Sequence, residues 1–222
     1  GNVLGDECLG SVGFALNALS ESVKVIVMLG HSRCGAVTAA VDAYLSPMKF
    51  WAKSTPPMLR SIMQRLFVAV REAAGGLKEV WGTGARDMLG YREALIDSAV
   101  CINAAQTAYD LRLEVERVGK FDIEVLYGVY NLFTHHVVAP IDVHDMETTT
   151  RLAYAMTNPR EFAALSIFLA HRLMRTVGPK SVEAGARNAL AQIEAAAAEA
   201  VKGNGHPVLK SKRAKAGRQP TE

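Results

Sequence analysis

The sequence predicts an α/β fold in which a mostly parallel β-sheet is flanked by helices. The order of its apolar segments and the size of its hydrophobic content support this prediction. Two apolar segments typical of strands, 23–29 and 121–130, are separated by long segments with helical periodicity. Strands joined through helices form parallel sheets that those helices cover. The chain has 222 residues, of which 50% are hydrophobic, and this suffices for one sizeable core.

The first 45 residues predict a loop, a short helix, a strand and a second helix. Residues 1–10 are rich in glycine and are expected to form the loop. Residues 11–19 have helical spacing, with Ser11 as the N-cap. Segment 23–29 is apolar almost throughout, as a buried central strand of a parallel sheet should be. The helix at 34–44 is expected to follow it directly.

The middle of the chain predicts two long helices before the second strand. After a loop at 50–57, residues 58–73 are amphipathic and are expected to form a packing or dimer helix that ends at Gly75-Gly76. Its apolar stripe contains Leu59, Ile62, Met63, Leu66 and Val70. Residues 91–118 form the second helix, with one apolar side. That side contains Leu95, Ala99, Ile102 and Ala105.

The character of the chain changes after Pro140. Three segments are expected to be helical, namely 146–157, 159–176 and 181–202. The expected organisation is therefore an α/β core at 1–140, a helical extension at 141–202 and a disordered tail at 203–222. From residue 202 onward there are six of the 25 Lys/Arg residues and one of the 22 acidic residues, so the remainder carries a net charge of −2. The basic character therefore belongs to the tail.

The composition favours a cytoplasmic protein. The sequence contains no run of 18 apolar residues and no pattern of a secretion signal, so neither membrane partners nor secretion are expected. Three widely spaced cysteines do not predict a disulfide framework and fit reduced thiols. The basic tail lacks interleaved aromatic residues, so a solvated tail is favoured over nucleic-acid binding.

One short motif carries most of the chemical information. The first strand ends at Gly30, and His31 and Cys34 stand three residues apart just before the next helix. Ligands of open parallel sheets bind at this edge, imidazole and thiolate are preferred zinc ligands, and a helix N-terminus favours a thiolate. An isolated H-x-x-C pair is a weak signal, so the strand–turn–helix context supports the metal-site interpretation.

Other residues with possible chemistry receive structural interpretations. Cys8, beside Asp6 and Glu7, is interpreted as a thiol in a loop or at a helix start rather than as a substitute ligand. Cys101 lies on an apolar helix face and is expected in the core. The remaining candidates are interpreted as loop or interface residues, with proton transfer as the lesser alternative (His135, His136), and as strand packing (Tyr127, Tyr130).

The segment Gly30-His31-Ser32-Arg33-Cys34-Gly35-Ala36, in its strand–turn–helix setting, resembles the β-class carbonic anhydrases, which carry G-H-S-x-C-G-[AG]. Three weaker matches occur in the same order as in that family: Gly1-Asn2 with the end of R-N-A-G-N, 11–19 with the helix before the zinc strand, and 126–130 with a late strand. The resemblance covers about residues 1–135.

The resemblance implies a function and a cofactor. The implied reaction is the reversible hydration of carbon dioxide to bicarbonate, with Zn²⁺ held by His31 and Cys34. Zinc lowers the pKa of its bound water to about 7, which provides a hydroxide nucleophile. The family also implies a homodimer or higher homo-oligomer, so the amphipathic helix at 58–73 is an interface candidate.

The departures from the family are equally informative. The family's third zinc ligand is a cysteine in C-x-D-S-R, whose aspartate and arginine gate the metal, and the sequence contains no such segment. No catalytic residue is therefore assigned. The chain begins with Gly1, and we expect a truncated chain, with a degenerate homologue as the alternative. Two other function classes remain open: a non-catalytic scaffold or interaction protein that has lost the complete zinc site, and a nucleic-acid binder that uses its tail.

Overall fold

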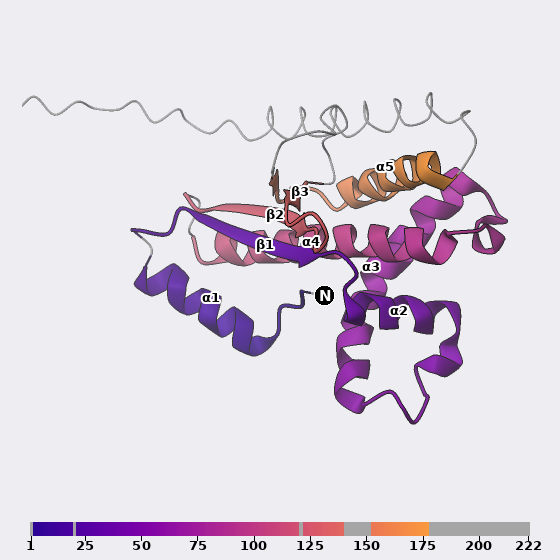
Figure 1. Ribbon diagram of the computed structural model, residues 1–222. Coiled ribbons are helices and arrows are strands. Elements are labelled where there is room, and N and C mark those ends of the chain that lie inside the picture. The colour runs from indigo at the N-terminus through magenta and orange to yellow at the C-terminus, as the bar shows by residue number, and fades with distance from the viewer. Residues whose placement is uncertain (1, 20, 120–121, 140–151, 178–222) are drawn as a thin grey trace, which may run out of the picture.

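The computed structural model describes residues 2–19, 21–119, 122–139 and 152–177 (Figure 1). Its elements in chain order are α1 (Asp6–Ala18), β1 (Val25–His31), α2 (Gly35–Leu45), α3 (Pro57–Trp81), α4 (Tyr91–Arg117), β2 (Glu124–Tyr130), β3 (Val137–Val138), β4 (Ala153–Tyr154) and α5 (Arg160–Val177). Short 3₁₀ turns lie at Pro47–Lys49 and Ala85–Asp87. The predicted α/β class is confirmed.

The sheet is mixed and is built around one long parallel pair. β1 and β2 run side by side along all seven residues of each strand, from Val25 opposite Glu124 to His31 opposite Tyr130. The two-residue strands β3 and β4 pair with β2 in the antiparallel direction. The longest pairing is thus parallel, as expected for two strands that are connected through helices.

Helix α4 covers one face of the sheet and forms the centre of the core. Its predicted apolar side is confirmed, because Leu95, Ala99, Ile102 and Ala105 are fully buried. On the sheet, Val125, Tyr127 and Val129 of β2 are buried on the same side. α3 packs against α4 and against α5, which adds a further helical layer (Figure 1).

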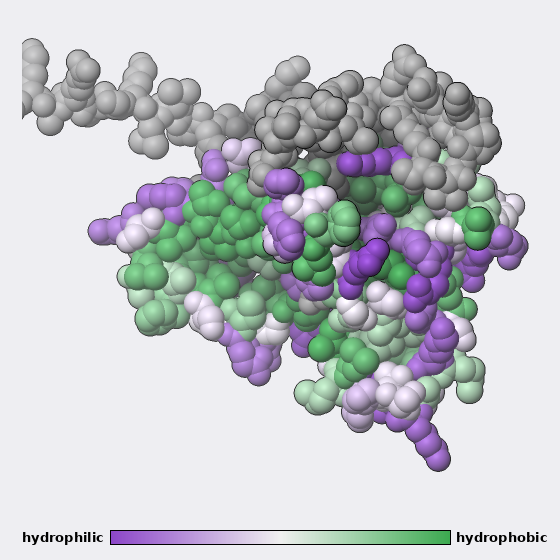
Figure 2. Space-filling model, in the orientation of Figure 1, coloured by the Kyte–Doolittle hydropathy of each residue, from purple (hydrophilic) through white to green (hydrophobic). Residues whose placement is uncertain are grey.

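The prediction that the first strand is buried on both faces is wrong. Val25, Val27 and Leu29 are 42–47% exposed, whereas the intervening Ile26 and Met28 face the core. Successive side chains of a strand point to opposite faces, and α4 covers one of those faces. Within the described residues β1 also lies at the edge of the sheet. Figure 2 shows apolar side chains gathered over this part of the molecule.

The first helix begins earlier than predicted. Residues 6–10, expected in a loop, are already helical, and two acidic residues, Asp6 and Glu7, occupy the first turn, where negative charge stabilises a helix. Ser11 is not the N-cap, because it lies inside α1 and its hydroxyl donates to the Glu7 carbonyl oxygen. The next helix is confirmed within one residue, since α2 begins at Gly35 with Cys34 as its N-cap.

The glycine pair expected to end the third helix does not end it. α3 continues through Gly75 and Gly76 to Trp81. Gly76 is fully enclosed where α3 meets α5, and a Cβ atom there would overlap the backbone of Ser166. Glycine therefore allows two helices to approach closely at this point, and the packing gained outweighs its low helix propensity.

The helix expected at 146–157 is wrong over its described part. Residues 153 and 154 form β4, and the Ala155 amide donates to the Val125 carbonyl oxygen, so pairing with β2 replaces a helix. Residues 146–151 lie outside the described residues, as do the helix expected at 181–202 and the tail. The helix expected at 159–176 is confirmed as α5. The domain boundaries remain predictions.

Candidate metal site at the carboxyl edge of the sheet

The structure confirms that the H-x-x-C motif lies in a strand–turn–helix unit. β1 ends at His31, two turn residues follow, and Cys34 caps α2. Arg33 has a φ of 53°, in the left-handed region that non-glycine residues rarely adopt. This backbone reversal makes the connection short enough for both candidate ligands to lie at the carboxyl edge of the sheet.

His31 has one ring nitrogen available for a metal. Its Nδ1 atom lies 3.0 Å from the carbonyl oxygen of Ser32. A carbonyl oxygen only accepts hydrogen bonds, so the proton of the neutral imidazole lies on Nδ1 and the lone pair lies on Nε2. Hydrogen bonding of the other ring nitrogen in this way orients metal-binding histidines. Nε2 is therefore the atom of His31 suited to a metal.

Cys34 lies in surroundings that favour its thiolate. The side chain is only 3% exposed, and this burial by itself raises the pKa of the thiol. The backbone N–H groups of Val37 and Ala36 hydrogen-bond to the sulfur and act in the opposite direction, so they lower the pKa. A thiolate is the form that binds zinc.

The other two cysteines do not share these surroundings. Cys8 is exposed on α1. Cys101 is partly buried within α4, and burial raises the pKa of its thiol to about 12, so it stays protonated near neutral pH. None of the three cysteines forms a disulfide.

The described residues offer two zinc-type donors, not a complete site. Among these residues, no group of three or more His, Cys, Asp or Glu side chains is placed to hold a metal ion. A catalytic zinc usually has three protein ligands and one open position. His31 and Cys34 therefore fit zinc by their chemistry but not by their number.

A loop on the neighbouring strand is attached to the turn that carries the two donors. The Ser32 amide donates to the Tyr130 carbonyl oxygen over 2.9 Å, and the Leu132 amide donates to the Ser32 hydroxyl over 3.0 Å. Tyr130 was interpreted as a packing residue, but its hydroxyl lies 3.0 Å from Nδ1 of His135. No sequence pattern signals this pair, because it depends on the conformation of the turn between them.

A cavity of about 660 Å³ lies near the same edge, between α3, α4 and the segment 2–4. The Asn103 amide group donates to Asn2 at its backbone oxygen (3.0 Å) and its side-chain oxygen (3.2 Å). Asn2 lies beside Gly30, the residue that precedes His31. Sequence reasoning missed this cavity because its walls come from segments that lie far apart in the sequence, from Asn2 to Phe162.

Comparison with known families identifies the part of the chain that carries the two donors. Residues 1–108 match the family model for carbonic anhydrase. The matched segment begins before α1 and ends within α4, so it includes His31 and Cys34. The resemblance to the carbonic anhydrases is thus confirmed over this segment.

One further comparison and one property of the helices bear on the function. A comparison with curated proteins gives no match. Within the described residues, no helix combines the length and the apolar character that crossing a membrane requires.

Proposed function

We propose that this chain forms part of a zinc-dependent carbonic anhydrase, which interconverts carbon dioxide and bicarbonate. The observation that carries the proposal is the turn from His31 to Cys34, which lies inside the segment that matches the family. In this proposal Nε2 of His31 and the thiolate of Cys34 are two of the zinc ligands. A third ligand comes from outside the described residues.

Two features of the surroundings support this assignment. The hydrogen bond from Nδ1 to the Ser32 carbonyl oxygen fixes the ring of His31 and leaves Nε2 accessible to a metal. The backbone N–H groups at the start of α2 stabilise the thiolate of Cys34 before any metal arrives. Both donors are thus prepared in the form in which they bind a metal.

The proposal also includes a homo-oligomeric state. The exposed face of β1 presents Val25, Val27 and Leu29, which is unusual for the apolar residues of a parallel sheet. Covering this face with a second copy would remove apolar surface from water. A cytoplasmic location remains a prediction.

Zinc binding by wild-type protein and by two ligand variants tests the assignment. We expect His31→Ala and Cys34→Ser each to weaken zinc affinity by more than about tenfold, because loss of a direct ligand should cost at least as much as loss of its supporting hydrogen bond. Cys8→Ser is the matched control, since it removes an exposed thiol and should leave the affinity unchanged.

The outcomes separate the proposal from its rival. Equal zinc affinity in all four proteins would contradict the assignment of His31 and Cys34. Zinc binding that depends on both residues, without measurable hydration of carbon dioxide in stopped-flow assays, would favour the non-catalytic scaffold. Hydration activity that is lost in both ligand variants and kept in Cys8→Ser would support the enzyme.

A further inference from the structure

The loop between β2 and β3 is held against the candidate site. Two hydrogen bonds join Ser32, the residue after His31, to this part of the chain, one to the end of β2 at Tyr130 and one to Leu132 of the loop. Tyr130, the last residue of β2, lies directly opposite His31 in the register of the parallel pair. Neighbouring strands lie about 4.8 Å apart, and paired residues of parallel strands project to the same face. Tyr130 and His31 are therefore paired residues on the same face of the sheet.

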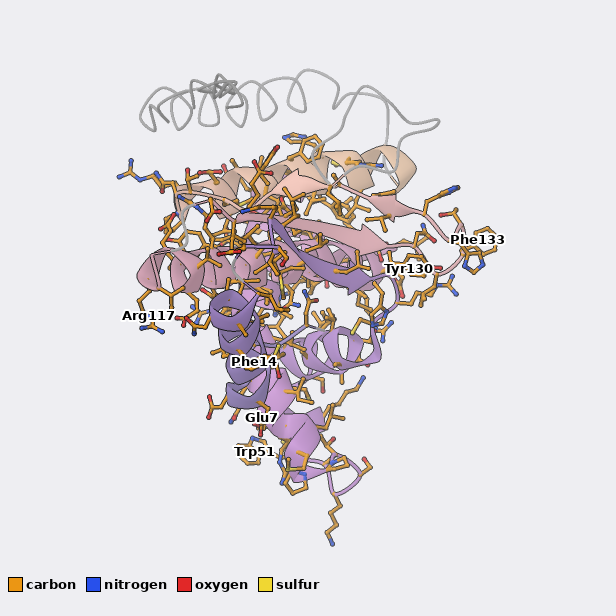
Figure 3. The ribbon with its side chains drawn as sticks, turned by 90° about the vertical axis from the view of Figure 1, so that its left-hand side faces the viewer. Glu7, Phe14, Trp51, Arg117, Tyr130 and Phe133 are labelled. Carbon is orange, nitrogen blue, oxygen red and sulfur yellow. The ribbon has the colours of Figure 1, made fainter. Side chains whose placement is uncertain are left out.

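A chain of hydrogen-bonding groups leads from this position to solvent. The hydroxyl oxygen of Tyr130 lies 3.0 Å from Nδ1 of His135. Tyr130 is partly buried and His135 is exposed. Figure 3 shows Tyr130 where the strands end, with Phe133 of the same loop beyond it. The pair thus connects the edge of the sheet with the surrounding water.

The loop holds His135 in place through its own hydrogen bonds. The side-chain oxygen of Asn131 accepts from the amides of Phe133 (2.9 Å) and Thr134 (3.1 Å). The backbone of Asn131 bonds to the amide of His135 and to the carbonyl oxygen of His136, each over 2.8 Å. His135 itself has a φ of 59°, which a non-glycine residue adopts only where the surrounding structure requires it. The ring is therefore positioned rather than left to move freely.

We infer that Tyr130 and His135 form a relay that carries a proton between the site and solvent. This inference rests on the proposed function, because hydration of carbon dioxide forms bicarbonate and releases one proton. As the water oxygen bonds to carbon, its O–H bond breaks and the proton passes to the oxygen of Tyr130. The hydroxyl proton of Tyr130 moves to Nδ1 of His135, and the resulting imidazolium releases a proton from Nε2 to solvent.

The chemistry of the two groups suits this role. A hydroxyl both donates and accepts hydrogen bonds, so Tyr130 passes a proton on without keeping a charge. Imidazole is the side chain that most often transfers protons in enzymes near neutral pH. The other ionisable side chains of the two joined segments are His31, Arg33, Cys34 and His136. Among these, His136 is an exposed histidine of the same loop, and the structure gives it no hydrogen bond to Tyr130.

Kinetics of His135→Ala and His136→Ala test the relay. We expect His135→Ala to lower kcat by about tenfold or more. The value of kcat/KM should stay unchanged, because it reports only the steps up to the formation of bicarbonate. Imidazole buffer should restore kcat, because a dissolved base replaces the missing ring. His136→Ala is the matched control, and its kinetics should equal those of the wild type.

A measurement that does not depend on activity accompanies the kinetics. ¹⁵N NMR of the His135 ring should show Nδ1 as a hydrogen-bond acceptor, with the proton on Nε2, in the wild type. Tyr130→Phe should change this signature and leave the signals of His136 unaltered. An unchanged His135 signature would overturn the pairing.

The results distinguish the relay from the proposed function. An active wild type whose kcat is equal in His135→Ala and His136→Ala would overturn the relay and leave the function in place. A wild type that binds zinc but does not hydrate carbon dioxide would overturn both. A loss of kcat/KM without rescue by imidazole would assign His135 a structural role and would also overturn the relay.

Discussion

Gly76 lies where α3 and α5 approach most closely, and replacing it with alanine tests how this packing is built. A Cβ atom at Gly76 would lie 2.5 Å from the backbone oxygen and 2.7 Å from the side-chain oxygen of Ser166. Backbone atoms cannot rotate away, so α5 must shift. Gly75 is the matched control, because a Cβ atom there meets nothing within 4 Å.

The two substitutions should change the free energy of unfolding in opposite directions. Replacing glycine with alanine inside a helix stabilises it by about 1 kcal/mol, and this gain applies to both positions. Overpacking costs about 1–3 kcal/mol, and a clash with backbone belongs at the upper end of that range. We therefore expect Gly75→Ala to raise the free energy of unfolding by about 1 kcal/mol and Gly76→Ala to lower it by about 2 kcal/mol.

Urea unfolding followed by tryptophan fluorescence measures both effects. Trp81 ends α3, is 7% exposed and donates through Nε1 to the Ala170 carbonyl oxygen of α5 over 3.0 Å, so it reports separation of the two helices. Trp51 is 69% exposed and is replaced by phenylalanine in all samples to remove its signal. Equal stability of Gly76→Ala and Gly75→Ala would refute the close approach of α3 and α5.

Two further predictions concern single contacts. Asp42→Asn should lower stability by about 1 kcal/mol at pH 7, because Arg92 on α4 binds both oxygens of Asp42 (2.7 and 3.1 Å) and lowers the pKa of this partly buried carboxyl. The difference should shrink as the pH falls below the ordinary aspartate value of about 3.9, and urea titrations at several pH values that show no such convergence would contradict it. Trp81→Phe should lower the free energy of unfolding by about 2 kcal/mol, because it leaves the Ala170 carbonyl oxygen unsatisfied and removes buried volume. Trp51→Phe, at an exposed position, should change stability little, and an equal effect of both substitutions in calorimetry would exclude this explanation.

The parts of the fold that depend on neighbouring residues were predictable from the sequence. The apolar run before Gly30 and the helix after Cys34 determine a strand–turn–helix unit within about 20 residues, and the structure places both candidate ligands in it. The buried side of α4 was predictable for a similar reason, because helical periodicity alone selects it. These features require no knowledge of distant segments.

The features that the sequence did not predict depend on distant partners. A pair of glycines often marks the end of a helix. At Gly75 and Gly76 only the position of Ser166 on α5 explains why α3 continues through them. Residues 153 and 154 form a strand rather than part of a helix because β2 pairs with them. Tyr130 and His135 are close in sequence, but their contact requires the left-handed backbone of His135. No residue pattern predicts that conformation.

The three cysteines show why position, rather than residue type, selects the candidate ligand. Cys34 is buried and Cys101 is partly buried, and burial acts on both thiols in the same direction, toward a higher pKa. Cys101 lies inside α4, where the backbone N–H groups already bond within the helix, so none of them lowers the pKa of its thiol, and burial prevails over the opposing charge of Arg172. Cys34 precedes the first turn of α2, where N–H groups without helical partners bond to the sulfur and oppose the effect of burial. Hydrogen bonds from the start of a helix favour the thiolate, which is the form of cysteine that binds zinc, and this is why Cys34 rather than Cys101 is the proposed ligand.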